Sequence, residues 1–504
     1  MPIVNRIINL LCSNRLREIE RFKRDPVGTQ TEQYRRLVES GDKTAIGREH
    51  GISAGIPYAE FCRRMPIMEY ADFAPYVERI RNGESGVTWN GRVGWFAKSS
   101  GTTSSKSKYI PVTLSGLNDS HMRGPKDIAI TYSHLYPRSG VYEGKMLALG
   151  GSKKLEKEGD SIASGDLSSI LIDRTPAIAS KFRVPSKEHA LIADFDQKVD
   201  YICRNATTQD VRSFVGVPSW NLVMMERVLD FTGKSNILEV WPNMELFTHG
   251  GMSFKPYKMQ FDKLIPSPQM KYFETYNASE GFFGIAERPY TDEMLLMLDY
   301  GTFYEFLPTD SLDDHSRAVP LEGVKVGVDY ALIITSTNGL WRYMLGDTVR
   351  FTSTSPYLFR VTGRTRLFVN AFGEEVIIDN AEAAMDRACR LTSSEIEEYT
   401  MAPIFMQDGQ KGSHEWVVAF RRAPSDIDAF AEALDQALQQ VNSDYEAKRR
   451  NNATLLRPTI TVVPSGTFME LLRIDGRLGG QIKIPRLSSE RTYVERLKAL
   501  AADR

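Results

Sequence analysis

The pattern that most constrains the fold of this chain is an alternation of short apolar runs with helical segments. The apolar runs are predicted to be buried strands, and they are Trp95–Ala97, Tyr109–Val112, Met146–Leu149, Leu238–Trp241, Leu295–Leu298 and Tyr330–Thr335. Strands that alternate with helices are typical of α/β domains, in which helices cover the faces of a sheet. We therefore expect an α/β fold with largely buried sheets.

The chain is also too long for one hydrophobic core. At 504 residues it exceeds the size at which single cores stop growing. The best boundary follows Arg364, because strands and helices mix in the roughly 140 residues beyond it. There we expect helices at Ile377–Leu391 and Ser425–Val441 and strands at Glu415–Phe420 and Thr459–Val463. This predicts an N-terminal domain of residues 1–364 and a compact α+β domain of residues 365–504.

Other segments predict local structure of a different kind. The first ninety residues are predicted to be mainly helical, and Asn82-Gly83 is expected to end one of these helices. Residues 151–168 are rich in Lys, Glu, Gly and Ser, which is typical of an exposed loop. The N-terminal apolar run is short and is followed at once by charged residues, so it predicts an amphipathic helix and no targeting signal.

Composition excludes several classes of function. The formal net charge is -1, so no whole-chain field attracts nucleic acid or an anionic membrane. The four cysteines are scattered, and no metal-ligand spacing joins them to histidines, which argues against a disulfide framework or a zinc site. No stretch approaches the ~18 apolar residues of a membrane span. We expect a cytoplasmic protein.

A segment made only of serine, threonine, glycine and lysine lies between two of the predicted strands. It runs from Lys98 to Lys108, with Ser99-Ser100-Gly101-Thr102-Thr103 near its start. Hydroxyls and backbone N–H groups donate to phosphate oxygens, and lysines supply positive charge. It is not a Walker loop, because serine stands where that motif has glycine before its Lys-Ser pair, and a strand follows it. It is either a nucleotide-phosphate loop or a solvated surface loop.

Residues 97–111 together resemble the phosphate motif of the Gretchen Hagen (auxin-responsive) acyl-acid-amido synthetases, within the adenylate-forming superfamily. The resemblance covers most of the chain, including residues 61–83 (FCRRMPIMEYADFAPYVERIRNG), Trp241-Pro242-Asn243 and Thr248-His249-Gly250-Gly251. It implies an α/β fold with a large N-terminal domain of αβ-layered sheets that contains a β-barrel-like subdomain. It also implies a small mobile α+β C-terminal domain, with a hinge near Arg364.

Two further motifs match that family in the same order. Tyr276-Asn277-Ala278-Ser279-Glu280 is similar to its Tyr-x-x-Ser-Glu, and Trp341-Arg342-Tyr343-Met344-Leu345-Gly346-Asp347 to its Tyr-Arg-x-x-Gly-Asp. By resemblance Tyr276 stacks on adenine, Ser279 contacts the α-phosphate and Glu280 holds Mg²⁺. An aromatic face suits a purine, and a carboxylate suits a hard cation. Asp347 is expected to accept hydrogen bonds from the ribose hydroxyls.

A third motif, Gly479-Gly480-Gln481-Ile482-Lys483-Ile484-Pro485-Arg486, carries the lysine that matches the catalytic lysine of the superfamily. A flexible ammonium suits the charge that develops on the α-phosphorus and on pyrophosphate. Glu280 and Lys483 are therefore the predicted catalytic residues. Together with Tyr276, Ser279 and Asp347, the predicted nucleotide-binding residues are Ser99, Ser100, Gly101, Thr102, Thr103, Lys108, Gly250, Gly251 and Arg364.

The acyl pocket is the least defined part of the site. Its expected walls include Trp220, Phe254 and Tyr257, for each of which core packing is the alternative. The chain departs from the family where Ser104 and Ser105 replace common glycines, and where the aspartate that often follows the Gly-Arg of the hinge is absent. Residues 368–375 (FVNAFGEE) look like the bacterial branch of the family, so plant hormones are not assumed as substrates.

The resemblance implies an ATP- and Mg²⁺-dependent ligase. A carboxylic acid attacks the α-phosphate to give an acyl-adenylate, and an amine, expected to be an amino acid, then releases AMP. The expected partners are these small molecules, with no nucleic acid and no membrane, and a monomer is expected. Two alternatives stay open: an acyl-CoA synthetase with a thiol acceptor, and a degenerate adenylate-forming scaffold without activity.

Overall fold

The computed structural model of the chain describes residues 2–99, 108–150, 155–158, 162–192, 194–251, 254, 257–365, 368–407, 410–474 and 484–502. Two groups of predicted site residues lie outside this part of the chain: Ser100 to Thr103, and Lys483. Of Ser99, the backbone alone is described. None of the helices among the described residues is both long enough and apolar enough to cross a membrane.

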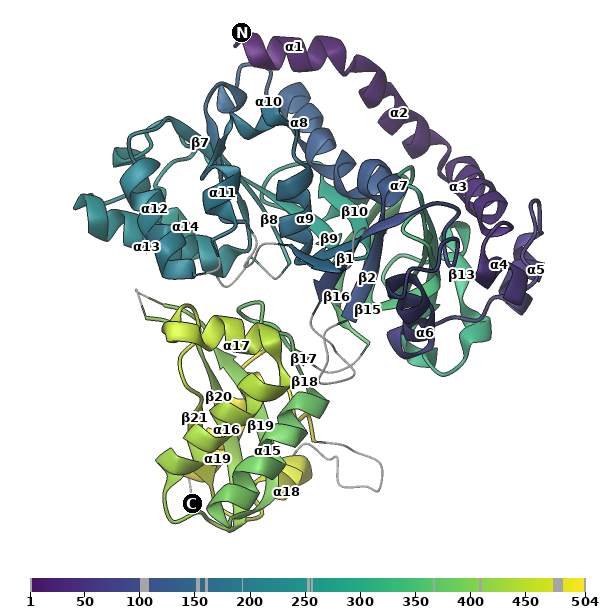
Figure 1. Cartoon of the computed structure of the whole chain (residues 1–504). Coiled ribbons are helices and arrows are strands. Elements are labelled where there is room, and N and C mark those ends of the chain that lie inside the picture. Colours follow the sequence, from purple (N-terminus) through teal and green to yellow (C-terminus); the bar gives the residue numbers. More distant parts are fainter. Residues whose placement is uncertain are drawn as a thin grey trace.

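The chain begins with helices, as its first ninety residues predict. They are α1 (Ile3–Leu11), α2 (Ser13–Arg24), α3 (Pro26–Gly41), α4 (Ala45–Glu49), α5 (Tyr58–Arg64) and α6 (Tyr70–Arg81). Figure 1 shows α1 to α3 following one another along the outside of the large lobe. The start of α3 is determined by local sequence. Asp25 caps the helix by accepting a hydrogen bond from the N–H of Gly28, and the fixed φ of Pro26 suits the first helical position.

The serine- and threonine-rich segment stands in the sequence between two strands that pair with each other. Strands β1 (Val93–Ser99) and β2 (Lys108–Thr113) pair antiparallel, and their register ends with Ser99 opposite Lys108. The expectation of one exposed loop over residues 151–168 is wrong in part, because β4 (Glu156–Glu158) and β5 (Ile162–Gly165) join this sheet in the order β2-β1-β5-β4. Backbone hydrogen bonds hold these polar strands at the edge of the sheet, because such bonds do not depend on which side chains the strands carry.

The large sheet has twelve strands, and one half of it is parallel. That half contains β6 (Arg183–Val184), β3 (Lys145–Ala148), β7 (Val211–Gly216), β8 (Leu246–Gly250) and β9 (Lys271–Ala278), side by side in this order. Within this half each strand is parallel to the next, so the carboxyl ends of the five strands share one edge. Ligands bind at this edge in open α/β sheets.

Helices connect and cover the parallel strands. They are α7 (Leu114–Gly116), α8 (Arg123–Leu135), α9 (Leu167–Arg174), α10 (Ala177–Ser180), α11 (Lys187–Ala190), α12 (Phe195–Asn205), α13 (Pro218–Thr232) and α14 (Lys258–Leu264). The predicted strand at Leu238–Trp241 is wrong. Residues Ile237–Glu239 form a 3-10 turn, and the buried Trp241 donates its indole N–H to the carbonyl of Ala206.

The other half of the sheet is antiparallel and continues from β9. Its strands are β10 (Gly281–Ala286), β11 (Met294–Leu296), β12 (Thr302–Pro308), β13 (Val319–Pro320), β14 (Asp329–Ser336), β15 (Leu340–Thr354) and β16 (Tyr357–Arg364). They lie in the order β13-β12-β14-β15-β16-β11-β10. The predicted strands at Leu295–Leu298 and Tyr330–Thr335 are thereby confirmed in kind, with slightly different bounds.

The residues beyond Arg364 form a smaller lobe, drawn in green to yellow in Figure 1. Its elements are β17 (Phe368–Val369), β18 (Val376–Ile377), α15 (Ile378–Thr392), β19 (Glu395–Ile404), β20 (Ser413–Arg422), α16 (Ile427–Val441), α17 (Ser443–Arg449), β21 (Thr459–Val463), α18 (Thr467–Ile474) and α19 (Thr492–Ala502). The two helices and two strands predicted here are present. The expected α/β class, with a small α+β part, is confirmed.

The smaller lobe shares an apolar core with α13 and α14. One continuous cluster of buried side chains includes Trp241 and Phe261 from the large lobe and Phe372 and Trp416 from the small one. Polar contacts cross the same boundary, because Gln260 donates its amide to the carbonyl of Met406. The contact between the two lobes is therefore made by packed apolar and polar side chains.

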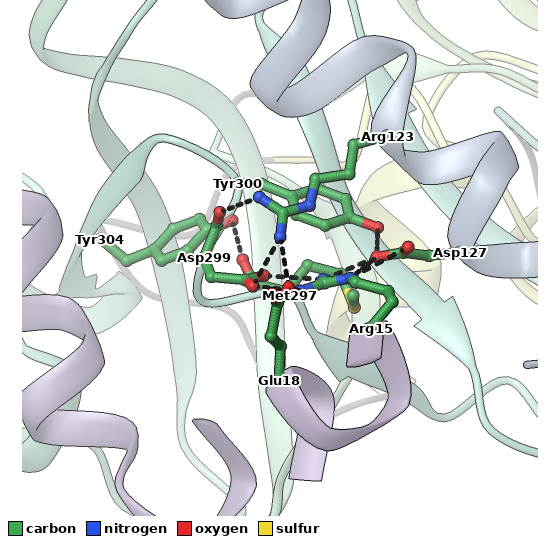
Figure 2. Close-up of polar contacts among 8 residues, drawn as sticks. All are labelled: Arg15, Glu18, Arg123, Asp127, Met297, Asp299, Tyr300 and Tyr304. Atoms are coloured by element: carbon green, nitrogen blue, oxygen red, sulfur yellow. Dashed lines mark hydrogen bonds and ion pairs between the residues drawn. The ribbon is translucent and has the colours of Figure 1, made fainter. Parts of the chain in front are cut away.

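A buried ion cluster fastens the N-terminal helices to the large sheet. Figure 2 shows Arg15 of α2 between Asp127 of α8 and Asp299, which follows β11. The Arg15 guanidinium lies 2.6 Å from an oxygen of Asp127, and the Tyr300 hydroxyl donates to the same oxygen at 2.7 Å. Arg123 donates to Asp299 as well. We call these residues, with Glu18, the anchoring cluster.

Candidate active site

Five of the predicted site residues converge around Asp347 of the long strand β15 and the turn that follows β9. Tyr276 lies on β9, Glu280 in the turn after it, Asp347 on β15, Arg364 at the end of β16 and Lys108 at the start of β2. Because β15 pairs with β16, Asp347 lies opposite Arg364. Residues separated by more than 200 positions thus meet at one place, which we call the charged cluster together with Glu375.

Asp347 contacts two other residues of this cluster. One oxygen of its carboxylate accepts from the Tyr276 hydroxyl at 2.6 Å, and the other lies 2.8 Å from Nε of Arg364. Arg364 also donates to Glu375 at 3.0 Å. Burial works to lower the pKa of Arg364, but Glu375 and Asp347 outweigh it and raise that pKa. Asp347 is therefore held in one orientation by Tyr276 and Arg364.

Glu280 carries an unusual carboxylate. It is 8% exposed and forms no ion pair with any described residue. Burial raises its pKa to about 7, the charge of Asp347 acts in the same direction, and Lys108 opposes the shift. Its backbone is fixed, because the side-chain amide of Asn338 donates to the Glu280 carbonyl at 3.0 Å. A positioned, uncompensated carboxylate is suited to bind a cation.

Lys108 is the matching uncommitted cation. It is also 8% exposed, and within the described ranges its ammonium makes neither an ion pair nor a hydrogen bond. Burial lowers the pKa of Lys108, against the attraction of Glu280. The ammonium lies 5.7 Å from the centre of the Tyr70 ring. Because Lys108 ends the serine- and threonine-rich segment, it lies where the predicted phosphate loop rejoins the sheet.

The glycine pair lies at the carboxyl end of β8, beside the charged cluster. Gly250 pairs with Thr275, and a side chain there is excluded because its Cβ would lie 2.4 Å from the Thr275 carbonyl. Gly251 has φ of +81°, which favours glycine, and its carbonyl accepts from the Asn370 amide. Ser279 is half-buried in the turn before Glu280.

Family comparisons agree with this arrangement of motifs. The model described as the GH3 family N-terminal domain matches residues 15–210, the central domain matches residues 295–364 and the C-terminal domain matches residues 379–492. All three belong to one family and follow in its order. The chain belongs to the GH3 family.

Curated relatives are distant but extend over nearly the whole chain. An indole-3-acetic acid-amido synthetase of Arabidopsis thaliana, GH3.4, is 22% identical over 94% of this chain and 91% of its own length. A jasmonoyl–L-amino acid synthetase of Nicotiana attenuata, JAR6, is 23% identical over 94% of this chain and 92% of its own. The expected family and ligase class are confirmed by these matches.

Solved structures confirm the adenylate-forming fold. The GH3.15 acyl acid amido synthetase superposes with a TM-score of 0.60 at 17% identity, covering 96% of this chain and 95% of that one. A 2-hydroxyisobutyryl-CoA ligase, solved with 2-HIB-AMP and CoA, has a TM-score of 0.53 at 13% identity, covering 95% and 93%. At these identities the likeness concerns the fold alone.

Two of the three residues predicted to line the acyl pocket, Tyr257 and Trp220, contact the small lobe. Tyr257 is completely buried, and its hydroxyl donates to the carbonyl of Ala371. Phe254 stacks on His249 with centroids 4.3 Å apart, and Trp220 contacts Phe195 at 4.4 Å and the Lys448 ammonium at 4.9 Å. The contacts of Tyr257 are those of a core residue, the alternative kept open for it.

Two residues of this GH3-family site were missed by sequence reasoning. Glu375 has φ of +42°, an uncommon conformation for a glutamate, and places its carboxylate against Arg364. Asn338 holds the Glu280 carbonyl and also accepts from the N–H of Thr113. The FVNAFGEE stretch marked Glu375 as part of a motif, but nothing in it indicated the ion pair with Arg364.

Proposed function

We propose that this GH3-family chain uses ATP to adenylate a carboxylic acid and then transfers the acyl group to the amine of an amino acid. The observation that carries the proposal is the charged cluster. In it Tyr276 of β9 and Glu280 of the following turn meet Asp347 of β15 and Arg364 of β16. The named activities of the relatives agree with amide formation. The ATP requirement follows from membership in an adenylate-forming family.

Nucleotide binding is assigned to the part of the cluster with fixed geometry. Asp347 accepts from the ribose hydroxyls, and its orientation is kept by Tyr276 and Arg364. The Tyr276 ring and the backbone of Gly250 and Gly251 flank the adenine. Lys108, with the hydroxyls of Ser99, Ser100, Thr102 and Thr103 and the N–H of Gly101, contacts the phosphates. Ser279 contacts the α-phosphate.

Glu280 fits a magnesium site of the kind that is shared with a nucleotide. No group of three or more metal-binding side chains occurs among the described residues, so no closed protein cage is present in that part of the chain. Mg²⁺ in nucleotide enzymes is held by one or two carboxylates, with phosphate oxygens and waters as its other ligands. When bound, Mg²⁺ neutralises charge on the phosphates of ATP. Glu280 supplies the protein ligand once its carboxylate is ionised.

The chemistry that remains is positioning and charge stabilisation. The acid attacks the α-phosphorus in line with the leaving pyrophosphate, and Lys483, brought by the domain of residues 365–504, neutralises charge on the α-phosphate. Lys108 and Arg364, which belong to the domain of residues 1–364, stabilise the same negative charge on the phosphates. In the second half-reaction the amine attacks the acyl carbonyl and AMP leaves. We place the hinge between these steps near Arg364.

ATP–pyrophosphate exchange tests the first half-reaction. A panel of aryl, indolyl and aliphatic acids is supplied with labelled pyrophosphate, and at least one acid is expected to drive exchange above the acid-free control. Absence of exchange with every acid would favour the inactive scaffold. The acyl-adenylate is then offered amino acids or coenzyme A, and formation of the thioester alone would favour the acyl-CoA synthetase alternative.

A further inference from the structure

Two buried polar side chains lie at the ligand-binding edge of the parallel sheet, beside the glycine pair. They are His249 near the end of β8 and Asn221 in the first turn of α13. Neither belongs to the charged cluster, and the mechanism above uses neither. Each leaves one polar atom without a hydrogen-bond partner. Leaving such an atom unpaired in the interior costs free energy, so its retention calls for an explanation.

His249 presents a neutral ring to this edge. It is 3% exposed, and its Nδ1 has no partner within the part of the chain that the structure describes. Burial lowers the pKa of His249 to about 3, so the imidazole carries one N–H donor and one acceptor at neutral pH. The Phe254 ring stacks on the imidazole and Phe247 lies 5.2 Å away, so apolar walls surround the polar group.

Asn221, on helix α13, is the second buried polar side chain. It is fully buried, its amide N–H₂ donates to the carbonyl of Val217 at 3.0 Å, and its Oδ1 is unpaired among the described residues. Exchanging the amide oxygen and nitrogen would also leave one of them unpaired, because only one contact is present. Asn221 follows directly on Trp220, a predicted wall of the acyl pocket.

Gly216 places the two groups on the same face of the sheet. It ends β7 opposite His249, so a side chain at position 216 would project on the same face as the imidazole. The Cβ of such a side chain would lie 3.1 Å from the Asn221 amide nitrogen, which places Asn221 on that face too. With φ of +134°, this position favours glycine. Glycine at position 216 therefore places no side chain against His249 and Asn221 on this face.

We propose that His249 and Asn221 form a polar subsite of the acyl pocket that binds a hydroxyl group on the carboxylic acid substrate. A hydroxyl donates one hydrogen bond and accepts another, so it pairs with the Asn221 oxygen and with a His249 Nδ1–H together. The surrounding Phe254 and Trp220 contact the carbon skeleton. The inference rests on the proposed adenylation and names its substrate class: hydroxylated acids rather than plain hydrocarbon acids.

Wild-type protein gives the first test, because it needs no variant. ATP–pyrophosphate exchange is measured with three matched pairs: para-hydroxyphenylacetate and phenylacetate, salicylate and benzoate, and β-hydroxybutyrate and butyrate. A site built to pair with a hydroxyl rejects the analogue that lacks it. In at least one pair the hydroxylated acid is expected to have kcat/KM at least about a hundredfold higher. Ratios below about threefold in every pair that exchanges would overturn the subsite.

The variants Asn221→Leu and His249→Phe give the second test. Each is expected to reduce the preference for the hydroxylated acid to within about tenfold, while KM for ATP changes by less than about twofold. Asn9→Leu is the matched control, because Asn9 also donates its amide to a backbone carbonyl and leaves its oxygen unpaired, on the distant helix α1. Its preference should equal that of the wild type.

The outcomes separate this inference from the proposed function. Exchange with the hydroxylated and plain acids alike would retain the ligase and reject the subsite. A rise in KM for ATP with an unchanged acid preference would assign His249 and Asn221 to the nucleotide and also reject it. Absence of exchange with any acid would reject the proposed function. If a variant unfolds at lower temperature than the wild type, the wild-type ratios decide.

Discussion

The anchoring cluster and the charged cluster are built from the same groups and differ in how those groups are paired. Each has two cations and three carboxylates, and in each a tyrosine hydroxyl donates to an aspartate. In the anchoring cluster Arg15 pairs with all three carboxylates, and Arg123 pairs with two of them. In the charged cluster, Lys108 and Glu280 have no ion-pair partner among the described residues.

This difference separates stability from function. Charges that are buried and fully paired hold elements together, and they are costly to break one at a time. A carboxylate whose pKa is displaced to about 7 and an ammonium left unpaired contribute little to holding the fold, but they can bind charged groups of a ligand. Each of the following substitutions should therefore affect either unfolding or catalysis, and not both.

The largest effect is expected from Arg15→Leu in the anchoring cluster. It leaves the buried Asp127 without its guanidinium, so the free energy of unfolding should fall by about 3–5 kcal/mol. Urea denaturation measures this loss. The exchange rate of the folded fraction should stay within about twofold of wild type. Arg35→Leu is the control, because Arg35 pairs with Glu39 on the surface of α3 and should leave stability unchanged. A fall in exchange activity without unfolding would break the distinction.

Lys483→Ala should have the largest catalytic effect. Removing the proposed ammonium should slow acyl-adenylate formation about a thousandfold, or ~4 kcal/mol, with ATP binding changed only a few-fold. Single-turnover formation of the adenylate and equilibrium binding of ATP measure the two quantities. Lys411→Ala, a substitution in the same lobe where the ammonium contacts the Asn452 carbonyl, is the control. Near-normal adenylation in Lys483→Ala would remove the lysine from the mechanism.

Glu280→Gln tests the uncommitted carboxylate with little change of shape. The rate of exchange should fall about a hundredfold, and the dependence on Mg²⁺ concentration should weaken, because the proposed metal ligand is lost. Since no described ion pair is broken, the free energy of unfolding at neutral pH should not decrease. The matched control is Glu18→Gln in the anchoring cluster, which should leave the metal dependence unchanged. An unaltered response to Mg²⁺ in Glu280→Gln would reject its role as ligand.

The pH dependence gives the smallest effect. Because the pKa of Glu280 is raised to about 7 in the folded protein, apparent Mg²⁺ affinity should fall about tenfold per pH unit below 7 and level off above it. In the absence of metal, the free energy of unfolding depends on pH with the opposite sign. The folded state holds the proton more tightly, so this contribution to stability is present at low pH and is lost as the pH rises through about 7. Both slopes should vanish in Glu280→Gln, and their persistence would assign the titration elsewhere.

The sequence predicted the elements whose pattern is local. The β1–β2 hairpin and the helices α15 and α16 follow from apolar periodicity alone. Leu238–Trp241 was mistaken for a strand because an apolar run does not distinguish a strand from a buried turn. The polar strand β4 was missed because it depends on backbone pairing with β5 and has no apolar signature.

The same limit applies to the site. Glu280 and Asp347 were predicted because each lies in a motif, whereas the contact of Asn338 with Glu280 and the pairing of Glu375 with Arg364 depend on how the backbone folds. A positive φ at a glutamate, as at Glu375, has no signature in the sequence. The orphaned atoms of His249 and Asn221 also become visible only when the neighbours of each side chain are known.

The apolar core shared by the two lobes has a thermodynamic consequence. If the small lobe turns about Arg364 between half-reactions, contacts between the lobes such as that of Tyr257 with Ala371 are broken, and buried apolar side chains of the shared cluster meet water. Exposure of apolar surface raises the heat capacity, so the equilibrium between the two arrangements should have a curved dependence on temperature. Cooling weakens apolar burial and should favour the separated arrangement. The balance between making the adenylate and consuming it should therefore shift with temperature, even where the bond chemistry does not.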